Sequence, residues 1–251
     1  MPTTQDVDLS ELSAERGGSQ PLRGYLARPS GAGHGSGPWP GIVVVHEVFG
    51  LDEQSREQTE RLAAAGYLTL AVDLFSAGGA RRCLVSVMRA LRRGEGLAFT
   101  DIDTGREWLS RSPAQAGGLG VIGFCLGGGF ALLTASGHGF DAASVNYALP
   151  PRDLDAKVDG ACPVVASYGG RDRPLRGAAA ALDTALTGAG VVHDVKEYPG
   201  AGHSFLNSAP NGPRILRPLL RVAGIGPDPA AADDAWRRIE TFFHANLRGV
   251  K

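Results

Sequence analysis

A chain of 251 residues with a formal net charge of −1 is long enough to bury a large core, and its charge balance excludes an extended basic surface for nucleic acid. Hydrophobic residues make up 43% of it, yet no apolar run reaches the length of a membrane span, which argues against an integral membrane protein. The odd count of three cysteines, without metal-type spacing, argues against a disulfide framework or a zinc knuckle.

These features set the broad expectations. Residues 1–15 are polar and acidic and lack the basic and apolar regions of a signal peptide. We expect a single domain over residues 1–251, located in the cytoplasm, as a monomer or a weakly associating homo-oligomer. We expect no nucleic-acid or membrane partner, no metal and no cofactor.

Apolar runs bounded by turn residues alternate with segments of helical periodicity along the chain. The runs predict a buried strand at 41–45 and further strands at 67–72, 119–124, 163–168 and 191–198. Helices are predicted at 52–65, where Asp52 is the cap, at 127–136, along the apolar face of 175–186, and at 231–247. Strands and helices that alternate in this way predict an α/β fold with a mainly parallel central sheet and helices on both faces.

Residues 76–96 are open to two interpretations. Four apolar residues between 84 and 91 have the spacing of one helical face, and arginines fill much of the remainder. The first interpretation is a surface helix with a solvated basic face. The second is a cap over the active site, in which arginines such as Arg81 meet an anionic substrate.

The segment Gly123-Phe124-Cys125-Leu126-Gly127 follows a predicted strand and opens a predicted helix. This is the nucleophile-elbow pattern, with cysteine in place of serine, in which flanking glycines relieve the crowding of a tight strand-to-helix turn. The helix N-terminus favours a thiolate at Cys125, and the Leu126 N–H is placed to donate to an oxyanion. We predict that Cys125 is a nucleophile, whereas Cys83 and Cys162 are interpreted as buried structural thiols.

The elbow pattern is typical of the α/β-hydrolase fold, in which an acid and then a histidine follow the nucleophile along the chain. Asp172 lies in a glycine-rich turn beyond the strand at 163–168, and His203 lies in a short turn after the strand at 191–198. We predict that these two residues complete a triad with Cys125. A second role for Asp172, as the N-cap of the helix that begins near Pro174, is compatible with the first.

The segment that follows the strand at 41–45 is the second candidate cluster. In this fold the second oxyanion donor arises here, and the Val48 N–H is the candidate. Glu47 stands between a buried strand and a turn, where a carboxylate can hold or accept a thiol proton. The alternative is a surface glutamate without a role. His46 is expected to order this loop rather than to react.

Four motifs together resemble the dienelactone hydrolase family: His46-Glu47-Val48-Phe49-Gly50, Gly123-Phe124-Cys125-Leu126-Gly127-Gly128, Gly170-Arg171-Asp172 and Gly202-His203-Ser204-Phe205. The resemblance extends from about residue 21 to 247. It implies an α/β-hydrolase fold and cleavage of an ester or lactone. It also implies that Glu47 pairs with the resting Cys125 thiol and takes its proton when substrate binds, that His203 stabilises the thiolate, and that Asp172 orients His203.

The sequence departs from the family at two positions. Family members that act on dienelactone bind its carboxylate through two arginines, and the matching positions here are Ala77 and Asn207. Arg81 or Arg82 is a candidate replacement; otherwise the preferred substrate is a neutral ester or lactone. The residues expected to contact the substrate are Phe49, Arg81, Tyr147, Phe205 and Asn207.

Two further functions remain open from the sequence. One is a hydrolase with the same chemistry that acts on thioesters. The other is a non-catalytic or redox-sensing protein that uses an activated Cys125 thiol, because a thiol of low pKa is also readily oxidised. The presence of Glu47, Asp172 and His203 favours the hydrolase, since a sensor does not need a complete triad.

Overall fold

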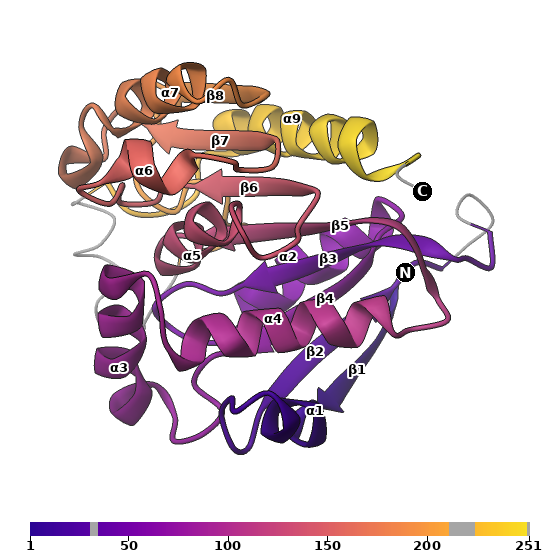
Figure 1. The fold of residues 1–251 in the computed structure, drawn as a ribbon. Coiled ribbons are helices and arrows are strands. Elements are labelled where there is room, and N and C mark those ends of the chain that lie inside the picture. The colour runs from indigo at the N-terminus through magenta and orange to yellow at the C-terminus, as the bar shows by residue number, and fades with distance from the viewer. Residues whose placement is uncertain (31–34, 211–223, 250–251) are drawn as a thin grey trace.

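The computed structural model describes residues 1–30, 35–210 and 224–249, and Figure 1 shows their fold. Within these residues one sheet is formed in the order β1-β2-β4-β3-β5-β6-β7-β8. Its strands are β1 (Thr3–Asp8), β2 (Arg23–Arg28), β3 (Trp39–Val45), β4 (Leu68–Asp73), β5 (Gln115–Phe124), β6 (Ala142–Asn146), β7 (Val164–Gly169) and β8 (His193–Tyr198). Strands β3 to β8 are parallel, whereas β1 and β2 pair antiparallel at one edge. The predicted α/β fold with a mainly parallel sheet is confirmed.

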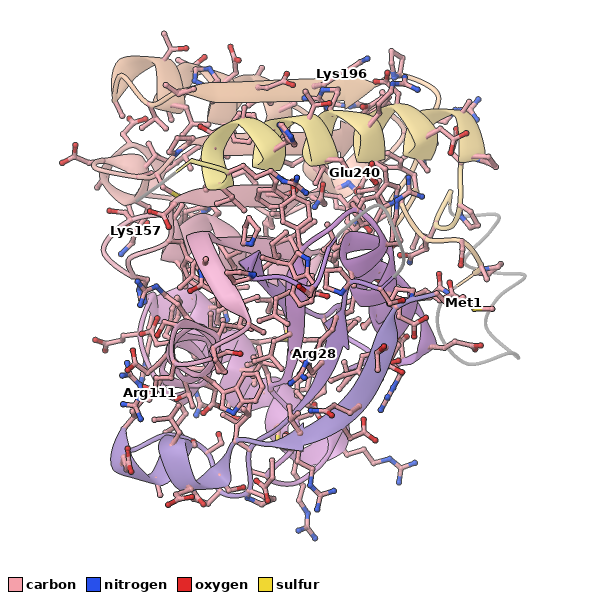
Figure 2. All side chains as sticks on the ribbon, turned by 90° about the vertical axis from the view of Figure 1, so that its right-hand side faces the viewer. Met1, Arg28, Arg111, Lys157, Lys196 and Glu240 are labelled. Atoms are coloured by element: carbon pink, nitrogen blue, oxygen red, sulfur yellow. The ribbon has the colours of Figure 1, made fainter. Side chains whose placement is uncertain are left out.

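Helices cover both faces of this sheet (Figure 1). They are α1 (Ser10–Glu15), α2 (Glu53–Ala64), α3 (Ala80–Arg93), α4 (Leu97–Ser110), α5 (Leu126–Thr134), α6 (Leu154–Val158), α7 (Ala178–Gly188) and α9 (Pro229–Leu247). Helices α2 and α9 lie side by side, because Arg61 of α2 bonds to Glu240 and stacks over the Trp236 ring of α9. Side chains such as Arg111, Lys157 and Lys196 point outward from the molecule (Figure 2).

The central strands form the core of the sheet. Residues 42–45 of β3 are fully buried, as expected for a parallel strand that is covered on both faces. The final helix buries the predicted face of Trp236, Ile239, Phe243 and Leu247 against the sheet. Among the described residues, no helix combines the length and the apolarity that crossing a membrane requires.

Several elements differ from the predicted ones for local reasons. Strand β1 is polar and mostly exposed along its length, so no hydrophobic period marks it. Strand β6 and helix α4 also lie where no element is predicted. The helix predicted along 175–186 begins only at Ala178, because Gly177 takes a φ of +79° and residues Arg173–Leu175 form a separate 3₁₀ turn. Asp52 caps α2 as predicted, accepting from the Ser55 N–H at 3.0 Å.

The parallel strands point their carboxyl ends to one edge of the sheet. The segments that follow β3, β5, β6, β7 and β8 therefore meet there, and they include Glu47, Cys125, Tyr147, Asp172 and His203. This edge is where open α/β sheets bind their ligands.

Candidate active site

Close backbone packing fixes the turn around Cys125. The turn between β5 and α5 leaves Cys125 at φ 54° and ψ −112°, a region that L-residues rarely adopt. A Cβ on Gly123 would lie 1.9 Å from the Gly127 carbonyl oxygen, and a Cβ on Gly127 would lie 2.1 Å from the Val45 oxygen. Both glycines are therefore required for steric reasons. The Cys125 N–H donates to the Asn146 oxygen at 3.0 Å, which ties this nucleophile turn (residues 123–127) to β6.

The two predicted oxyanion donors belong to neighbouring segments, the start of α5 and the turn after β3. Leu126 is the first residue of α5, where an N–H has no preceding intrahelical acceptor and remains available to a ligand. Val48 lies in the tight turn in which the Gly50 N–H donates to the Glu47 oxygen at 3.2 Å. Because Gly127 packs directly against the end of β3, the two segments are neighbours. The donor roles of Leu126 and Val48 remain predictions.

The predicted acid and histidine meet at the same edge. His203 Nδ1 lies 2.5 Å from Asp172 Oδ2, and the Asp172 side chain is buried. Asp172 precedes the 3₁₀ turn but makes no side-chain cap bond to it, so the structure does not contain the alternative N-cap interaction. The Cys125 sulfur acts on the pKa of the His203 ring, so it belongs to the surroundings of that ring. The structure thus places Asp172 against His203 and brings Cys125 to the same edge of the sheet.

The charge state of His203 follows from these contacts. Burial alone lowers the pKa of His203, but the hydrogen bonds and charges of Asp172 and Cys125 outweigh burial and raise it to about 10. Beside a charged sulfur the ring is therefore an imidazolium at neutral pH.

Glu47 is a buried carboxylate, not a surface residue, with 4% of its area exposed. The Tyr147 hydroxyl donates to its Oε1 at 3.1 Å, the Ser204 hydroxyl to its Oε2 at 3.3 Å, and the Asn207 amide to its Oε1 at 3.3 Å. Burial, together with the charges of Glu47 and Cys125, raises the pKa of Tyr147 well above its usual value, which keeps the phenol a donor. Gln58 in turn donates to Asn207. We refer to these five residues as the Glu47 cluster: Glu47, Tyr147, Ser204, Asn207 and Gln58.

Backbone strain is concentrated in these two regions. Among the described residues, the non-glycine positions with positive φ are Cys125, Tyr147 at 40° and Ser204 at 57°. Such positions cost free energy and persist where the surrounding structure enforces them, which is typical of functional sites. One holds the nucleophile, and the other two place the donors to Glu47.

Comparison with known proteins agrees with this geometry. The model of the dienelactone hydrolase family matches residues 22–247. This chain belongs to the dienelactone hydrolase family. A carboxymethylenebutenolidase of Rhodococcus opacus is 30% identical over 265 aligned positions, which cover 98% of this chain and 94% of that protein.

Solved structures of the family share the fold. The dienelactone hydrolase of Anabaena variabilis has a TM-score of 0.68 at 20% identity, with 98% of this chain and 99% of that chain covered. A dienelactone hydrolase-like promiscuous phosphotriesterase from metagenomic libraries has a TM-score of 0.75 at 22% identity, with the same coverage. The α/β-hydrolase fold is thereby confirmed, and the chain is an ester- or lactone-cleaving hydrolase of this family.

The predicted substrate-contact residues of this hydrolase differ in their surroundings. Phe49 is 40% exposed, whereas Phe205 is fully buried and packs its ring 5.7 Å from that of Tyr147. Asn207 is 3% exposed and is part of the Glu47 cluster. Arg81 is exposed on α3, and among the described residues it forms no ion pair within 4 Å. Helix α3 is thus a surface helix with exposed arginines, and its role as a cap whose arginines meet an anionic substrate remains a prediction.

His46 holds the Glu47 loop in place, as expected. Its Nδ1 lies 2.7 Å from the Glu47 carbonyl oxygen, and its Nε2 accepts from the Leu74 N–H at 3.1 Å. Burial lowers the pKa of His46, so the ring is neutral and can donate at one nitrogen while it accepts at the other. The loop after β3 is thereby attached to the loop after β4.

Sequence reasoning misses the residues that support Glu47 from outside the motifs. Gln58 of α2 donates to Asn207 at 2.8 Å, and no pattern in the sequence marks it. Ser204 belongs to a quoted motif, but its contact with Glu47 spans 157 positions. Within the described residues, no cluster of three or more His, Cys, Asp or Glu side chains is arranged to hold a metal ion.

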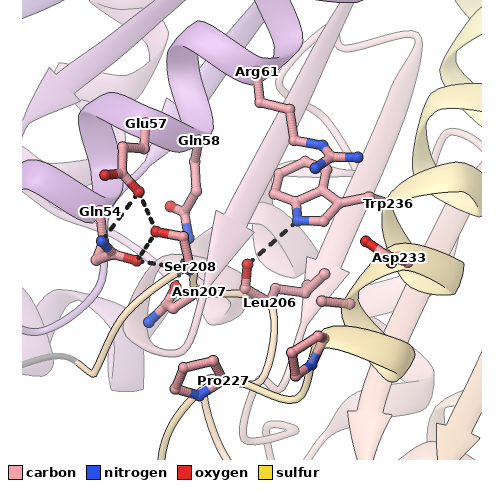
Figure 3. Close-up of a pocket in the computed structure, with 12 residues that line it drawn as sticks. Gln54, Glu57, Gln58, Arg61, Leu206, Asn207, Ser208, Pro227, Asp233 and Trp236 are labelled. Atoms are coloured by element: carbon pink, nitrogen blue, oxygen red, sulfur yellow. Dashed lines mark hydrogen bonds between the residues drawn. The ribbon is translucent and has the colours of Figure 1, made fainter.

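A cavity of about 340 Å³ adjoins the Glu47 cluster on the side of α2 and α9. Gln58, Asn207 and Trp236 contribute to its wall, while Cys125, His203 and Asp172 do not (Figure 3). The Trp236 indole N–H donates to the Leu206 oxygen at 3.3 Å, which fixes one side of it. The triad residues therefore do not line this cavity, which adjoins the Glu47 cluster through Gln58 and Asn207.

Proposed function

We propose that this hydrolase cleaves an ester or lactone through an acyl-cysteine intermediate on Cys125. The observation that carries the proposal is the 2.5 Å contact between His203 and Asp172 at the sheet edge where the strained turn presents Cys125. A thiol, an imidazole and an orienting carboxylate in this order form the arrangement that activates a nucleophile. A thioester substrate would undergo the same chemistry.

Acylation uses both regions of the site. Glu47 accepts the thiol proton as substrate enters, and the thiolate is stabilised by the His203 imidazolium. The sulfur attacks the carbonyl carbon, and the oxyanion receives hydrogen bonds from the N–H groups of Leu126 and Val48. The carbon–oxygen bond then breaks, and the leaving oxygen takes its proton from His203.

Deacylation requires His203 to act as a base, and the causes of its pKa support this change of role. Two of the contributions that raise the pKa of His203 come from Cys125, and a thioester sulfur carries no charge. Formation of the acyl-cysteine therefore lowers the pKa of His203, while Asp172 still orients the ring. The neutral ring accepts a proton from water, the water oxygen bonds to the acyl carbon, and the sulfur leaves as thiolate. The thiolate then takes back the proton that Glu47 holds, which restores the starting state.

We further propose that the preferred substrates lack a carboxylate. Ala77 cannot bind an anion through its side chain, and the Asn207 amide is already bonded to Glu47 and Gln58. The exposed ring of Phe49 offers an apolar contact near the Glu47 loop. All three cysteines are free thiols, which supports the predicted reducing, cytoplasmic compartment.

The proposal is tested by trapping the intermediate. The parent protein is mixed with p-nitrophenyl acetate, quenched in acid within the burst phase and mapped by peptide mass spectrometry. We expect an acetyl group on the peptide that contains Cys125 and none on Cys83 or Cys162. Turnover without an adduct on Cys125 would contradict the mechanism.

A further inference from the structure

Two amide side chains connect helix α2 to the Glu47 carboxylate. Gln58 Nε2 donates to Asn207 Oδ1 at 2.8 Å, and Asn207 Nδ2 donates to Glu47 Oε1 at 3.3 Å. All three side chains are at most 5% exposed. We propose that Gln58 is a positioning residue, which fixes the direction of the Asn207 amide and thereby keeps Glu47 ionised and ready to accept the Cys125 proton. This inference rests on the proposed function.

We call the hydrogen-bonded series Gln58–Asn207–Glu47 the amide relay. Its direction follows from the carboxylate of Glu47. An ionised carboxylate can only accept hydrogen bonds, so Asn207 must present its NH₂ group to Glu47. The Asn207 oxygen then faces Gln58, which must present its own NH₂ group in turn. Reversal of Gln58 alone would place two carbonyl oxygens against each other.

The amide oxygen of Gln58, at the far end from Glu47, lacks a hydrogen bond, which agrees with this direction. Gln58 Oε1 is buried and has no hydrogen-bond partner among the described residues. A buried amide without constraint would turn to satisfy its oxygen, because an unpaired buried acceptor is costly. The bond to Asn207 therefore decides the orientation of Gln58, although Gln58 also borders the cavity in Figure 3.

The relay acts on Glu47 among several titratable neighbours. Tyr147 donates directly to the Glu47 carboxylate, and the His46 ring contacts the Glu47 carbonyl oxygen. Asp73 lies 3.7 Å from His46 Nε2, while the charge of Cys125 acts on Tyr147 and on His203. Burial lowers the pKa of His46 and raises that of Tyr147, so both are neutral near pH 7. Loss of a donor to a buried carboxylate raises its pKa. A reversed relay is therefore expected to protonate Glu47 at a higher pH.

The Gln58→Glu variant reverses the relay with little change of shape. The new carboxylate accepts from the Asn207 NH₂ group, so the Asn207 oxygen turns toward Glu47. We expect the acid limb of the kcat/KM profile on p-nitrophenyl acetate to move up by about one pH unit, a roughly tenfold loss on the acid side. At alkaline pH the variant should converge on the parent, because Glu47 is ionised in both. A merely structural role would lower kcat/KM at every pH.

Two further variants separate the relay from charge and from folding. Gln54→Glu adds the same charge one helical turn earlier, where the amide contacts Ser208 and Glu57 instead of Asn207, and it should leave the acid limb in place. Gln58→Met removes the donor without adding charge and should shift the limb in the same direction by less. If Gln58→Glu fails to fold in circular dichroism melts, Gln58→Met decides the question.

The outcomes distinguish this inference from the proposed function. The relay is overturned if the kcat/KM profile of Gln58→Glu runs parallel to that of the parent. It is also overturned if Gln54→Glu moves the acid limb as far as Gln58→Glu does. If the parent still shows the acyl adduct on Cys125 in that case, only the relay is wrong. If the parent shows no such adduct, the proposed function fails and this inference fails with it.

Discussion

At the nucleophile turn the backbone fixes the geometry, whereas at Glu47 side chains from distant segments do so. Added Cβ atoms at Gly123 and Gly127 would overlap main-chain atoms, so close packing fixes the backbone position of Cys125. Glu47 depends instead on hydrogen bonds from Tyr147 and from residues after β8. The difference teaches that Cys125, the predicted nucleophile, is placed by sterics, which few substitutions can adjust. Glu47, its predicted proton acceptor, is held by contacts that can be tuned.

The largest expected effect falls on the nucleophile itself. Cys125→Ala should lower kcat/KM by at least about 10³-fold, because the acyl intermediate cannot form. Thermal stability should change little, since Ala fits the same space. Steady-state kinetics on p-nitrophenyl acetate measure the first effect and calorimetry the second. Cys162→Ala is the matched control for activity, and full activity in Cys125→Ala would sink the mechanism.

The next effects are the losses of kcat/KM in His203→Ala and Asp172→Ala, which should differ in size. His203→Ala should approach the loss of Cys125→Ala, because His203 transfers protons in both half-reactions. Asp172→Ala should lose less, since Asp172 orients and stabilises the imidazolium without itself reacting. Both variants are compared by kcat/KM under the same conditions. An Asp172→Ala variant as active as the parent would show that another acid holds His203.

A smaller effect tests whether the substrate site lacks the positive charge that would bind a carboxylate. Charged hydrogen-bonded contacts contribute roughly 1.5–3 kcal/mol each, so the absence of two arginines should lower kcat/KM for a carboxylate-bearing lactone by on the order of 10². The methyl ester of the same compound should not incur this loss. Kinetics on the matched pair decide the matter. A preference for the carboxylate form that Arg81→Ala or Arg82→Ala abolishes would show that the anion site has moved.

The smallest effect concerns the pKa of His203 and the contribution of the Cys125 sulfur to it. The folded-state pKa of His203, about 10, lies above its ordinary value of 6.5. Its contribution to stability is therefore fully present below about pH 6.5 and is lost as pH rises through about 10. In Cys125→Ala the contributions of the sulfur disappear, and the pKa of His203 should fall. NMR titration of the ring Hε1 signal measures both values, and equal midpoints would contradict the assigned cause.

Sequence patterns predict the parts of this site that depend on near neighbours. The apolar runs mark all the parallel strands except β6, and the elbow glycines mark Cys125, because each signal lies within a few positions. Asp172 and His203 follow from their places after strands, and their contact confirms that they meet. The polar edge strand β1 and the start of α7 at Ala178 escape the same reasoning, because pairing at an edge and the φ of Gly177 leave no hydrophobic period.

Tertiary structure alone decided what surrounds Glu47. Its donors lie 100, 157 and 160 positions away, and Gln58 lies 149 positions from the residue it supports. No periodicity connects such positions, because their proximity arises only when the parallel strands bring their carboxyl ends to one edge. The sequence by itself determined most of the parallel strands and the tight turn at Cys125, through local sterics and burial, and it predicts the triad. Folding decided that a glutamate in a loop became a buried carboxylate with an amide relay behind it.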